Sequence, residues 1–204
     1  MNTDFHINSY DFILPNEQIA QNPAAKRDES RLMAIDGSTA EIVHTSFSAI
    51  ADFFNPEDIL VVNDTKVFPA RLRGKKDTGG KVELLLLHYP CAQSCPAKNQ
   101  YGFSHYTPAV KGLLKSSKRP KPGSHLLFGS DLEAIVEEII DDGSVLVTLL
   151  WNGNLDEVLL KYGIMPLPPY IRRDDLRNRE NDIARYQTVY ARESGAIAAP
   201  TAGL

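Results

Sequence analysis

ILVVNDTKVFPARL, residues 59–72, is the stretch at which the expected fold changes character. Its first four residues are apolar on both faces, which is typical of a central strand covered from both sides. Asn63, Asp64 and Thr65 follow, and polar groups at the end of a buried strand are a usual place for a ligand site in α/β proteins. The alternative is that Asn63 and Asp64 only close a turn through side-chain bonds to the backbone. The residues leave both interpretations open.

Downstream of this stretch, the sequence predicts an antiparallel β domain. From about residue 71 to residue 151, short apolar runs of strand length alternate with turn sequences such as GG, KPG and DDG. Many short strands with little helix between them are typical of a small barrel or sandwich.

The flanking parts of the chain carry weaker patterns. Residues 14–21 resemble the start of a helix, because a proline near the first turn is followed by an acidic residue. Residues 32–36 and 41–44, separated by a glycine turn, predict a hairpin. A helix that stops at Gly163 is predicted by apolar residues at helical spacing, namely Leu155, Val158, Leu159 and Tyr162.

The last stretch, RYQTVYARESGAIAAPTAGL, residues 185–204, indicates a ligand loop or, equally, a plain loop with a short β segment. Its end is made of small residues, which let the backbone itself approach a ligand. Its beginning offers a charge, an amide, a hydroxyl and an aromatic face, from Arg185, Gln187, Thr188 and Tyr190.

The bulk composition is that of an ordinary globular protein. Hydrophobic residues make up 43% of the chain and charged residues 24%, with a net charge of −4. No secretory signal and no membrane-length apolar run is visible, and Cys91 and Cys95 lack the further ligands of a zinc site. We therefore expect a reduced, cytoplasmic protein without a metal or membrane contact.

One local cluster is strongly basic. It contains no acid, and it consists of Lys111, Lys115, Lys118, Arg119 and Lys121. Such a patch is able to meet phosphates, and the alternative is a solvated hairpin whose lysines protect an edge strand.

Six blocks, in order, resemble the S-adenosylmethionine:tRNA ribosyltransferase-isomerase family of the queuosine pathway. They are IAQNPAAKRDESRL (19–32), ILVVNDTKVFPARL (59–72), TGGKVELLLL (78–87), MPLPPYI (165–171), RYQTVYA (185–191) and GAIAAPTAGL (195–204). Members of that family continue beyond the last block, so the chain is expected to be the N-terminal portion of such a protein.

The resemblance implies a fold of the α/β class. A layered α-β-α domain, discontinuous in sequence, would comprise residues 1–70 and 152–204, and an antiparallel β-barrel would be inserted at residues 71–151. This agrees with the change of pattern after residue 71.

The resemblance also implies a reaction. The family transfers the ribosyl part of S-adenosylmethionine, a co-substrate, to 7-aminomethyl-7-deazaguanine in tRNA and isomerises it, giving epoxyqueuosine, adenine and methionine. Asp64 and Tyr190 are the candidate catalytic residues, with Asp64 either as a base or as a partner of a ribose hydroxyl, and Tyr190 either stacked on adenine or placed near the sulfonium. Candidate substrate contacts are Asn63, Thr65, Arg185, Gln187, Thr188, Pro200, Thr201, Ala202 and Gly203, and the basic cluster at residues 111–121 becomes a candidate tRNA contact. No cofactor is implied, and a monomer is expected.

Two other functions remain open at this point. The chain is a candidate for a tRNA-binding module without catalysis, because the predicted barrel and its lysines do not depend on a complete site. A hydrolase that uses Asp64 and Glu193 as paired carboxylates has no support beyond the presence of these acids.

Overall fold

A computed structural model gives the architecture of the chain and describes residues 6–90, 93–94, 101–173 and 178–204. The chain divides into two compact units, one made of Met1–Ile59 and Pro168–Asp174 and the other of Leu60–Leu167 and Asp175–Leu204. The finer boundaries expected for the inserted domain, at residues 71 and 151, stay a prediction.

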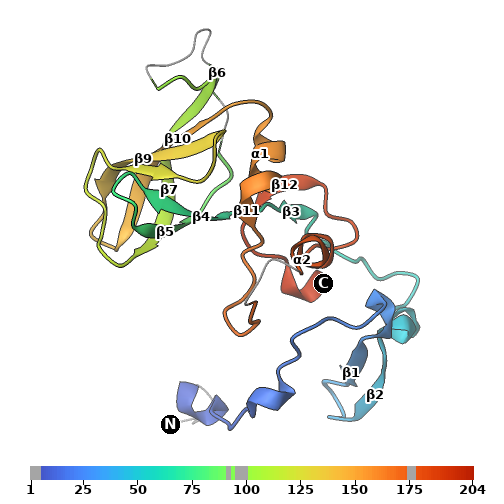
Figure 1. Cartoon of the computed structure of the whole chain (residues 1–204). Coiled ribbons are helices and arrows are strands. Elements are labelled where there is room, and N and C mark those ends of the chain that lie inside the picture. Colours follow the sequence, from blue (N-terminus) through green and yellow to red (C-terminus); the bar gives the residue numbers. More distant parts are fainter. Residues whose placement is uncertain (1–5, 91–92, 95–100, 174–177) are drawn as a thin grey trace. The chain divides into compact units, whose positions relative to one another are not determined.

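The larger unit contains a closed antiparallel barrel (Figure 1). Among the described residues, six strands follow the order β10-β9-β8-β4-β5-β7, and β10 pairs with β7 to close the ring. The strands are β4 (Arg71–Lys76), β5 (Lys81–Leu86), β7 (His105–Ser116), β8 (His125–Leu127), β9 (Leu132–Ile139) and β10 (Ser144–Trp151). Two short strands extend the sheet, since β6 (Gln93–Ser94) pairs with β7 and β11 (Gly163–Ile164) pairs with β4. The predicted barrel is confirmed.

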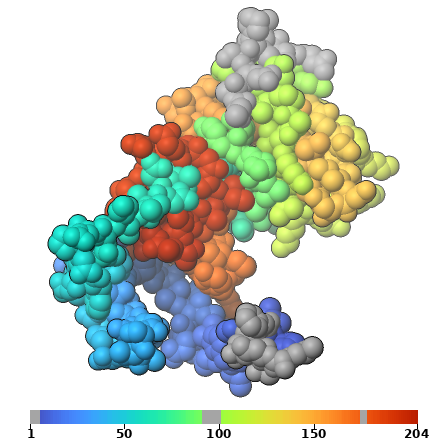
Figure 2. All heavy atoms as spheres, turned by 180° about the vertical axis from the view of Figure 1, so that it is seen from behind, coloured from blue at the N-terminus to red at the C-terminus, as the bar shows by residue number. Residues whose placement is uncertain are grey.

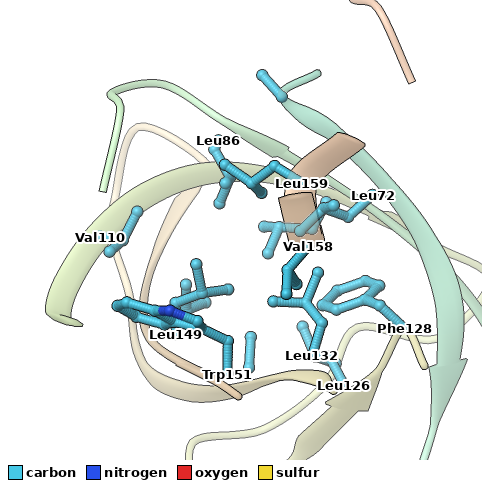
Figure 3. Close-up of a cluster of buried hydrophobic side chains, with 14 of the residues drawn as sticks. Leu72, Leu86, Val110, Leu126, Phe128, Leu132, Leu149, Trp151, Val158 and Leu159 are labelled. Atoms are coloured by element: carbon cyan, nitrogen blue, oxygen red, sulfur yellow. The ribbon is translucent and has the colours of Figure 1, made fainter. Parts of the chain in front are cut away.

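The alternation of side chains along each strand explains why the ring closes around an apolar core. In β5, Val82, Leu84 and Leu86 are buried, whereas Lys81 is exposed. Strands β4, β9 and β10 contribute buried residues in the same way, and Figure 3 shows these side chains meeting inside the ring. Full burial of each such side chain contributes about 1.5–3 kcal/mol, so this core is the main source of the unit's stability.

Helix α1 (Leu155–Tyr162) covers one end of this core. The Asn154 side chain caps it by accepting a hydrogen bond from the Glu157 N–H at 3.2 Å. The helix stops before Gly163, as predicted. A Cβ at Gly163 would stand 2.1 Å from the carbonyl oxygen of Pro69, so this position requires glycine for the close approach of β11 to the barrel.

A strand that follows the barrel in the sequence pairs with a strand that precedes it. Strand β3 (Thr65–Val67) pairs in parallel with β12 (Glu193–Ala196), and helix α2 (Arg179–Arg185) lies between them in the sequence. A small apolar cluster of Val67, Met165 and Ala199 joins these elements. A parallel strand pair with helices, together with the inserted antiparallel barrel, confirms the predicted fold class.

The smaller unit contains the predicted hairpin. Strand β1 (Arg31–Ile35) pairs antiparallel with β2 (Ile42–Ser46), and a 3₁₀ helix, Phe47–Phe53, follows. In the turn, the Asp36 carboxylate accepts hydrogen bonds from the Ser38 hydroxyl at 2.6 Å and from the Thr39 N–H at 2.9 Å. These bonds, led by the one from Ser38, lower the pKa of Asp36 to about 2.

Two predictions for the first part of the chain are wrong. A single 3₁₀ turn, Asn16–Gln18, stands where the pattern at residues 14–21 predicted a helix. The apolar run at residues 59–62 is not a strand, and its residues are exposed, with Ile59 at 90% and Val61 at 87%. An apolar run becomes a buried strand only where neighbours pair with it and cover it. None of the described residues does so here.

Candidate functional site

The parallel pairing of β3 with β12 brings the two candidate stretches together (Figures 1 and 2). Glu193 stands opposite Thr65, and the Arg192 N–H donates to the Asp64 carbonyl oxygen at 2.7 Å. At the other end of the pair, the Phe68 N–H donates to the Ala196 carbonyl oxygen at 3.1 Å. Residues that are far apart in the sequence therefore form one small piece of structure.

The Asp64 side chain is held by a residue that the sequence analysis did not single out. Arg192 Nη2 donates to Asp64 Oδ2 at 2.8 Å, and Arg192 Nε lies 3.5 Å from Glu193 Oε1. Because Arg192 is 76% exposed, the ion pair contributes only about 0–1 kcal/mol to stability. The ion pair instead orients the Asp64 carboxylate, because Arg192 holds Oδ2 and leaves Oδ1 for a second partner.

Asn63 and Thr65 form the turn that the sequence offered as an alternative. Asn63 Oδ1 accepts from the Thr65 N–H at 3.0 Å and from the Thr65 hydroxyl at 2.7 Å. This is a side-chain-to-backbone turn of the kind that asparagine favours. Asp64 takes no part in it and is free to face Arg192.

Gln187 uses its amide on the backbone of β3. Its Oε1 accepts from the Val67 N–H at 2.9 Å, and its Nε2 donates to the Val67 carbonyl oxygen at 2.5 Å. Val67 is only 2% exposed, so these two bonds satisfy backbone groups that water does not reach. In this structure Gln187 positions β3.

Thr188 and Tyr190 lie against the end of the chain. A Cβ at Gly203 would stand 2.3 Å from Tyr190 Oη and 3.1 Å from Thr188 Cγ2, so a larger residue at this position would require the Tyr190 side chain to shift. Thr188 is 4% exposed, and its hydroxyl makes no hydrogen bond with any described residue. A buried hydroxyl without a partner costs about 1–3 kcal/mol, and such groups in native proteins call for an explanation.

The remaining predicted residues, Arg185 and residues 200–202, lie in the elements on either side of the Thr188–Tyr190 segment in the sequence. Arg185 ends helix α2, where its charge suits the negative end of the helix dipole. Residues 200–203 form a 3₁₀ turn in which the Gly203 N–H donates to the Pro200 carbonyl oxygen at 2.8 Å. Thr201 and Ala202 are exposed, and Tyr190 is 37% exposed. The turn therefore presents small residues beside an accessible aromatic ring.

The predicted tRNA-contact cluster is not one uniform patch. Lys111 Nζ binds Asp142 Oδ2 at 2.8 Å, and this bond, with those from Ser144, holds the pKa of Asp142 well below its usual range. Arg119 Nη2 donates to the Gly143 carbonyl oxygen at 2.6 Å. Lys115 and Lys121 are exposed. At Lys111, strand β7 is bonded to β10 on one side and to the Leu87 N–H on the other, so protection of an edge strand does not explain this lysine. At Lys115 the register pairs β7 with β5 only, so edge protection remains an explanation there.

Among the described residues, no three histidine, cysteine or acidic side chains come together in a way that would hold a metal ion. Both Cys91 and Cys95 lie outside the described residues. Within the described part of the chain, every helix is too short or too polar to cross a membrane.

Comparisons with known proteins agree with one another. The family described as "Queuosine biosynthesis protein" matches residues 7–204. An S-adenosylmethionine:tRNA ribosyltransferase-isomerase from Desulfotalea psychrophila is 43% identical over 209 residues, which is 100% of this chain and 54% of that protein. One of the same name from Clostridium kluyveri is 44% identical over 97% of this chain and 53% of its own length. The chain thus spans about half the length of the curated relatives it matches.

A solved structure also resembles the chain. It is that of an S-adenosylmethionine tRNA ribosyltransferase from Thermotoga maritima, 28% identical, with an alignment that covers 79% of this chain and 51% of that one. The TM-score is 0.30.

Proposed function

Because the chain belongs to the queuosine biosynthesis protein family, we propose that it forms part of a tRNA ribosyltransferase-isomerase. The reaction joins the ribosyl moiety of S-adenosylmethionine to the aminomethyl nitrogen of 7-aminomethyl-7-deazaguanine in tRNA. It rearranges the sugar to the epoxycyclopentane of epoxyqueuosine and releases adenine and methionine. The observation that carries the proposal is the β3–β12 pairing, which joins the Asp64 turn to the segment that contains Tyr190 and Gly203.

Asp64 is proposed as the base that starts the reaction. The positive sulfur of S-adenosylmethionine acidifies the hydrogens on the neighbouring ribose C5′, so a carboxylate oxygen beside C5′ removes one as a proton. The electron pair left on C5′ begins the expulsion of adenine, which takes up a proton as it leaves. The amine then forms its bond to the sugar and releases a proton, and the carbon–sulfur bond breaks as the sulfur departs with methionine. Arg192 is a positioning residue in this scheme, because it holds Oδ2 at 2.8 Å and leaves Oδ1 to take the proton.

Tyr190 and Thr188 are proposed to contact the nucleoside. The accessible ring of Tyr190 is suited to lie over adenine or the sulfonium, and a cation over an aromatic face gains about 0.5–2 kcal/mol. The buried Thr188 hydroxyl still has a hydrogen bond to give. The backbone of residues 200–203 would lie against the ligand, and Arg185 would bind a carboxylate or phosphate. Asn63 and Thr65 shape the turn, and Gln187 holds β3.

The partner tRNA is proposed to contact the basic cluster at residues 111–121. Among the described residues, Lys111 is bound to Asp142 and Arg119 already donates to the Gly143 carbonyl oxygen, so we assign the remaining lysines, Lys115, Lys118 and Lys121, to phosphates. A tRNA substrate would put this chemistry in the cytoplasm. We propose further that the protein acts as a monomer, uses S-adenosylmethionine as a co-substrate and needs no tightly held cofactor.

Adenine release is the test of this function. The chain, and a version extended to the length of its relatives, would be incubated with S-adenosylmethionine and tRNA that carries the aminomethyl precursor. Adenine is expected only when both substrates and the longer protein are present. If the longer protein releases none, the proposed reaction is wrong.

A second function is favoured by the way the apolar core is distributed. The largest buried cluster belongs to the barrel and to α1, and it is closed within residues that this chain contains. A tRNA-binding module without catalysis is therefore the alternative. It predicts a salt-dependent affinity of the 204-residue chain for tRNA, with no adenine released.

A further inference from the structure

The outer surface of strands β4, β5 and β7 carries a group of four positive side chains. Three of them lie outside the cluster at residues 111–121, and the fourth, Lys115, belongs to it. The register places Arg73 opposite Glu83, Glu83 opposite Lys115, and Lys75 opposite Lys81. Their neighbours Leu72, Val82 and Leu84 are buried in the barrel, so alternation sends the charged residues outward. We call this surface the cationic face, defined by Arg73, Lys75, Lys81 and Lys115.

The charges of the cationic face are poorly balanced. Its one carboxylate, Glu83, accepts from Arg73 Nε at 2.9 Å and lies 3.6 Å from Arg71 Nη1. For Lys75, Lys81 and Lys115, no acidic partner exists among the described residues. Lys75 and Lys81 form a directly opposed cross-strand pair, and like charges in that position destabilise a sheet.

Protection of a sheet edge does not explain Lys75. This residue is paired on both sides, with Lys81 of β5 and with Leu127 of β8. The register gives Lys81 and Lys115 a strand partner on one side only, Lys75 and Glu83 respectively. At Lys75, therefore, the repulsion between like charges costs stability without protecting an edge.

The same side chains line a hollow. It has a volume of about 650 Å³ and lies between the Arg73–Lys75 side of β4 and the Lys115 end of β7. Ser116 and Ser117 also line it, and the Ser116 hydroxyl donates to the Lys118 carbonyl oxygen at 2.9 Å. Cations two residues apart on a strand stand about 7 Å apart, and opposed cations about 5 Å apart. These spacings are shorter than the Debye length of about 10 Å at 0.1 M salt, so the charges act on a ligand together.

We propose that the cationic face binds the phosphate backbone of RNA. Lysine and arginine at close spacing suit phosphates, and no aromatic ring on which a base could stack is among the residues that line the hollow. The contact is therefore independent of sequence and positions the RNA on the barrel. The inference rests on the proposed function for its ligand, tRNA, and it extends the cluster at residues 111–121, with which the cationic face shares Lys115, onto β4 and β5.

The test compares two reversals of charge. Lys75→Glu removes one cation of the face and turns the repulsive pair with Lys81 into an attractive one, so this variant is expected to fold. Lys26→Glu is the control, because it makes the same change in net charge on the other compact unit, at a side chain that is 74% exposed. Binding of an unmodified tRNA transcript is measured by fluorescence anisotropy over a range of salt concentrations, and urea unfolding checks that both variants are folded.

The expected result is a specific loss in the Lys75 variant. Each phosphate contact contributes roughly 0.7–0.9 to the slope of log affinity against log salt, so losing one weakens binding roughly five- to eightfold at 0.1 M. Lys75→Glu should show at least this loss together with a lower slope, and Lys26→Glu should bind like the unchanged protein. Equal affinities and slopes for the two variants would overturn the proposal. Binding to phosphatidylglycerol vesicles in place of the transcript would overturn it as well.

The two proposals fail in different ways. If the family-length protein releases adenine but Lys75→Glu leaves tRNA binding unchanged, only the cationic face is refuted. If Lys75→Glu weakens tRNA binding but no adenine is ever released, only the proposed reaction is refuted.

Discussion

Replacement of Gln187 by alanine tests how the candidate site is held together. In the structure, the Gln187 amide satisfies both the N–H and the carbonyl oxygen of Val67, at 2.9 Å and 2.5 Å. Alanine removes both partners and leaves the two groups in a position that is 2% exposed. Each buried backbone group left unpaired costs about 1–3 kcal/mol, so Gln187→Ala should weaken the β3–β12 pairing by at least about 2 kcal/mol.

Amide hydrogen exchange at Phe68 measures this effect locally. The Phe68 N–H is bonded to the Ala196 carbonyl oxygen on β12, so it exchanges only when the pair opens. A loss of about 2 kcal/mol corresponds to roughly thirtyfold faster exchange. Amides of the barrel, such as those of β5, should keep their protection.

Val189→Ala is the matched control, because Val189 lies in the same loop and is 77% exposed. A truncation at such a surface position changes stability by less than about 0.5 kcal/mol. If Phe68 exchanges at the same rate in Gln187→Ala as in Val189→Ala, the two bonds do not hold β3 and the reasoning is refuted.

Two further predictions concern the barrel and the hairpin. Gly129→Ala would place a Cβ 2.1 Å from the Tyr162 ring, so urea unfolding should show a loss of about 1–3 kcal/mol from overpacking, whereas Gly37→Ala, with nothing within 4 Å, should not. An equal effect at both glycines would contradict the packing of α1. The Asp36 carboxylate, whose pKa is lowered to about 2, stabilises the β1–β2 hairpin above its unfolded pKa near 3.8, and this contribution is lost as the pH falls through about 2. The amide exchange of the hairpin should therefore become faster as the pH falls from about 3.8 to about 2, and Asp36→Asn should remove this pH dependence. If the Asp36→Asn protein shows the same pH dependence as the unchanged protein, Asp36 is not its cause.

The barrel could be predicted from the sequence because its signals are local. Alternating apolar residues such as Val82, Leu84 and Leu86 define one face of a strand wherever its neighbours lie, and glycine turns separate the strands. The same holds for helix α1, whose apolar stripe and Gly163 are contained within a few residues.

The run at residues 59–62 shows that a local apolar pattern is not enough to predict a strand. Its apolar pattern reports that the segment suits burial on both sides, but a strand also needs partners, and those are not visible in a local pattern. Among the described residues no strand pairs with it, and Ile59 is 90% exposed.

The candidate site was predicted only in part, for a related reason. The residue types in the block that contains Tyr190 suggested a ligand loop, and β12 does pair with β3. Arg192 was missed because its contact with Asp64 crosses 128 residues of sequence, and a single arginine beside a motif carries no such information. The backbone role of Gln187 was missed likewise, since an amide is equally suited to a ligand and to Val67.

The most direct measurement is the rate of adenine release by the family-length protein with Asp64 replaced by asparagine. Asparagine keeps the size of the side chain and still offers an oxygen to Arg192, but it does not take the C5′ proton. General-base catalysis contributes roughly 10²–10⁴-fold, so the rate should fall by at least about 10²-fold while the affinity for tRNA is unchanged. Undiminished adenine release by Asp64→Asn would contradict the proposed site.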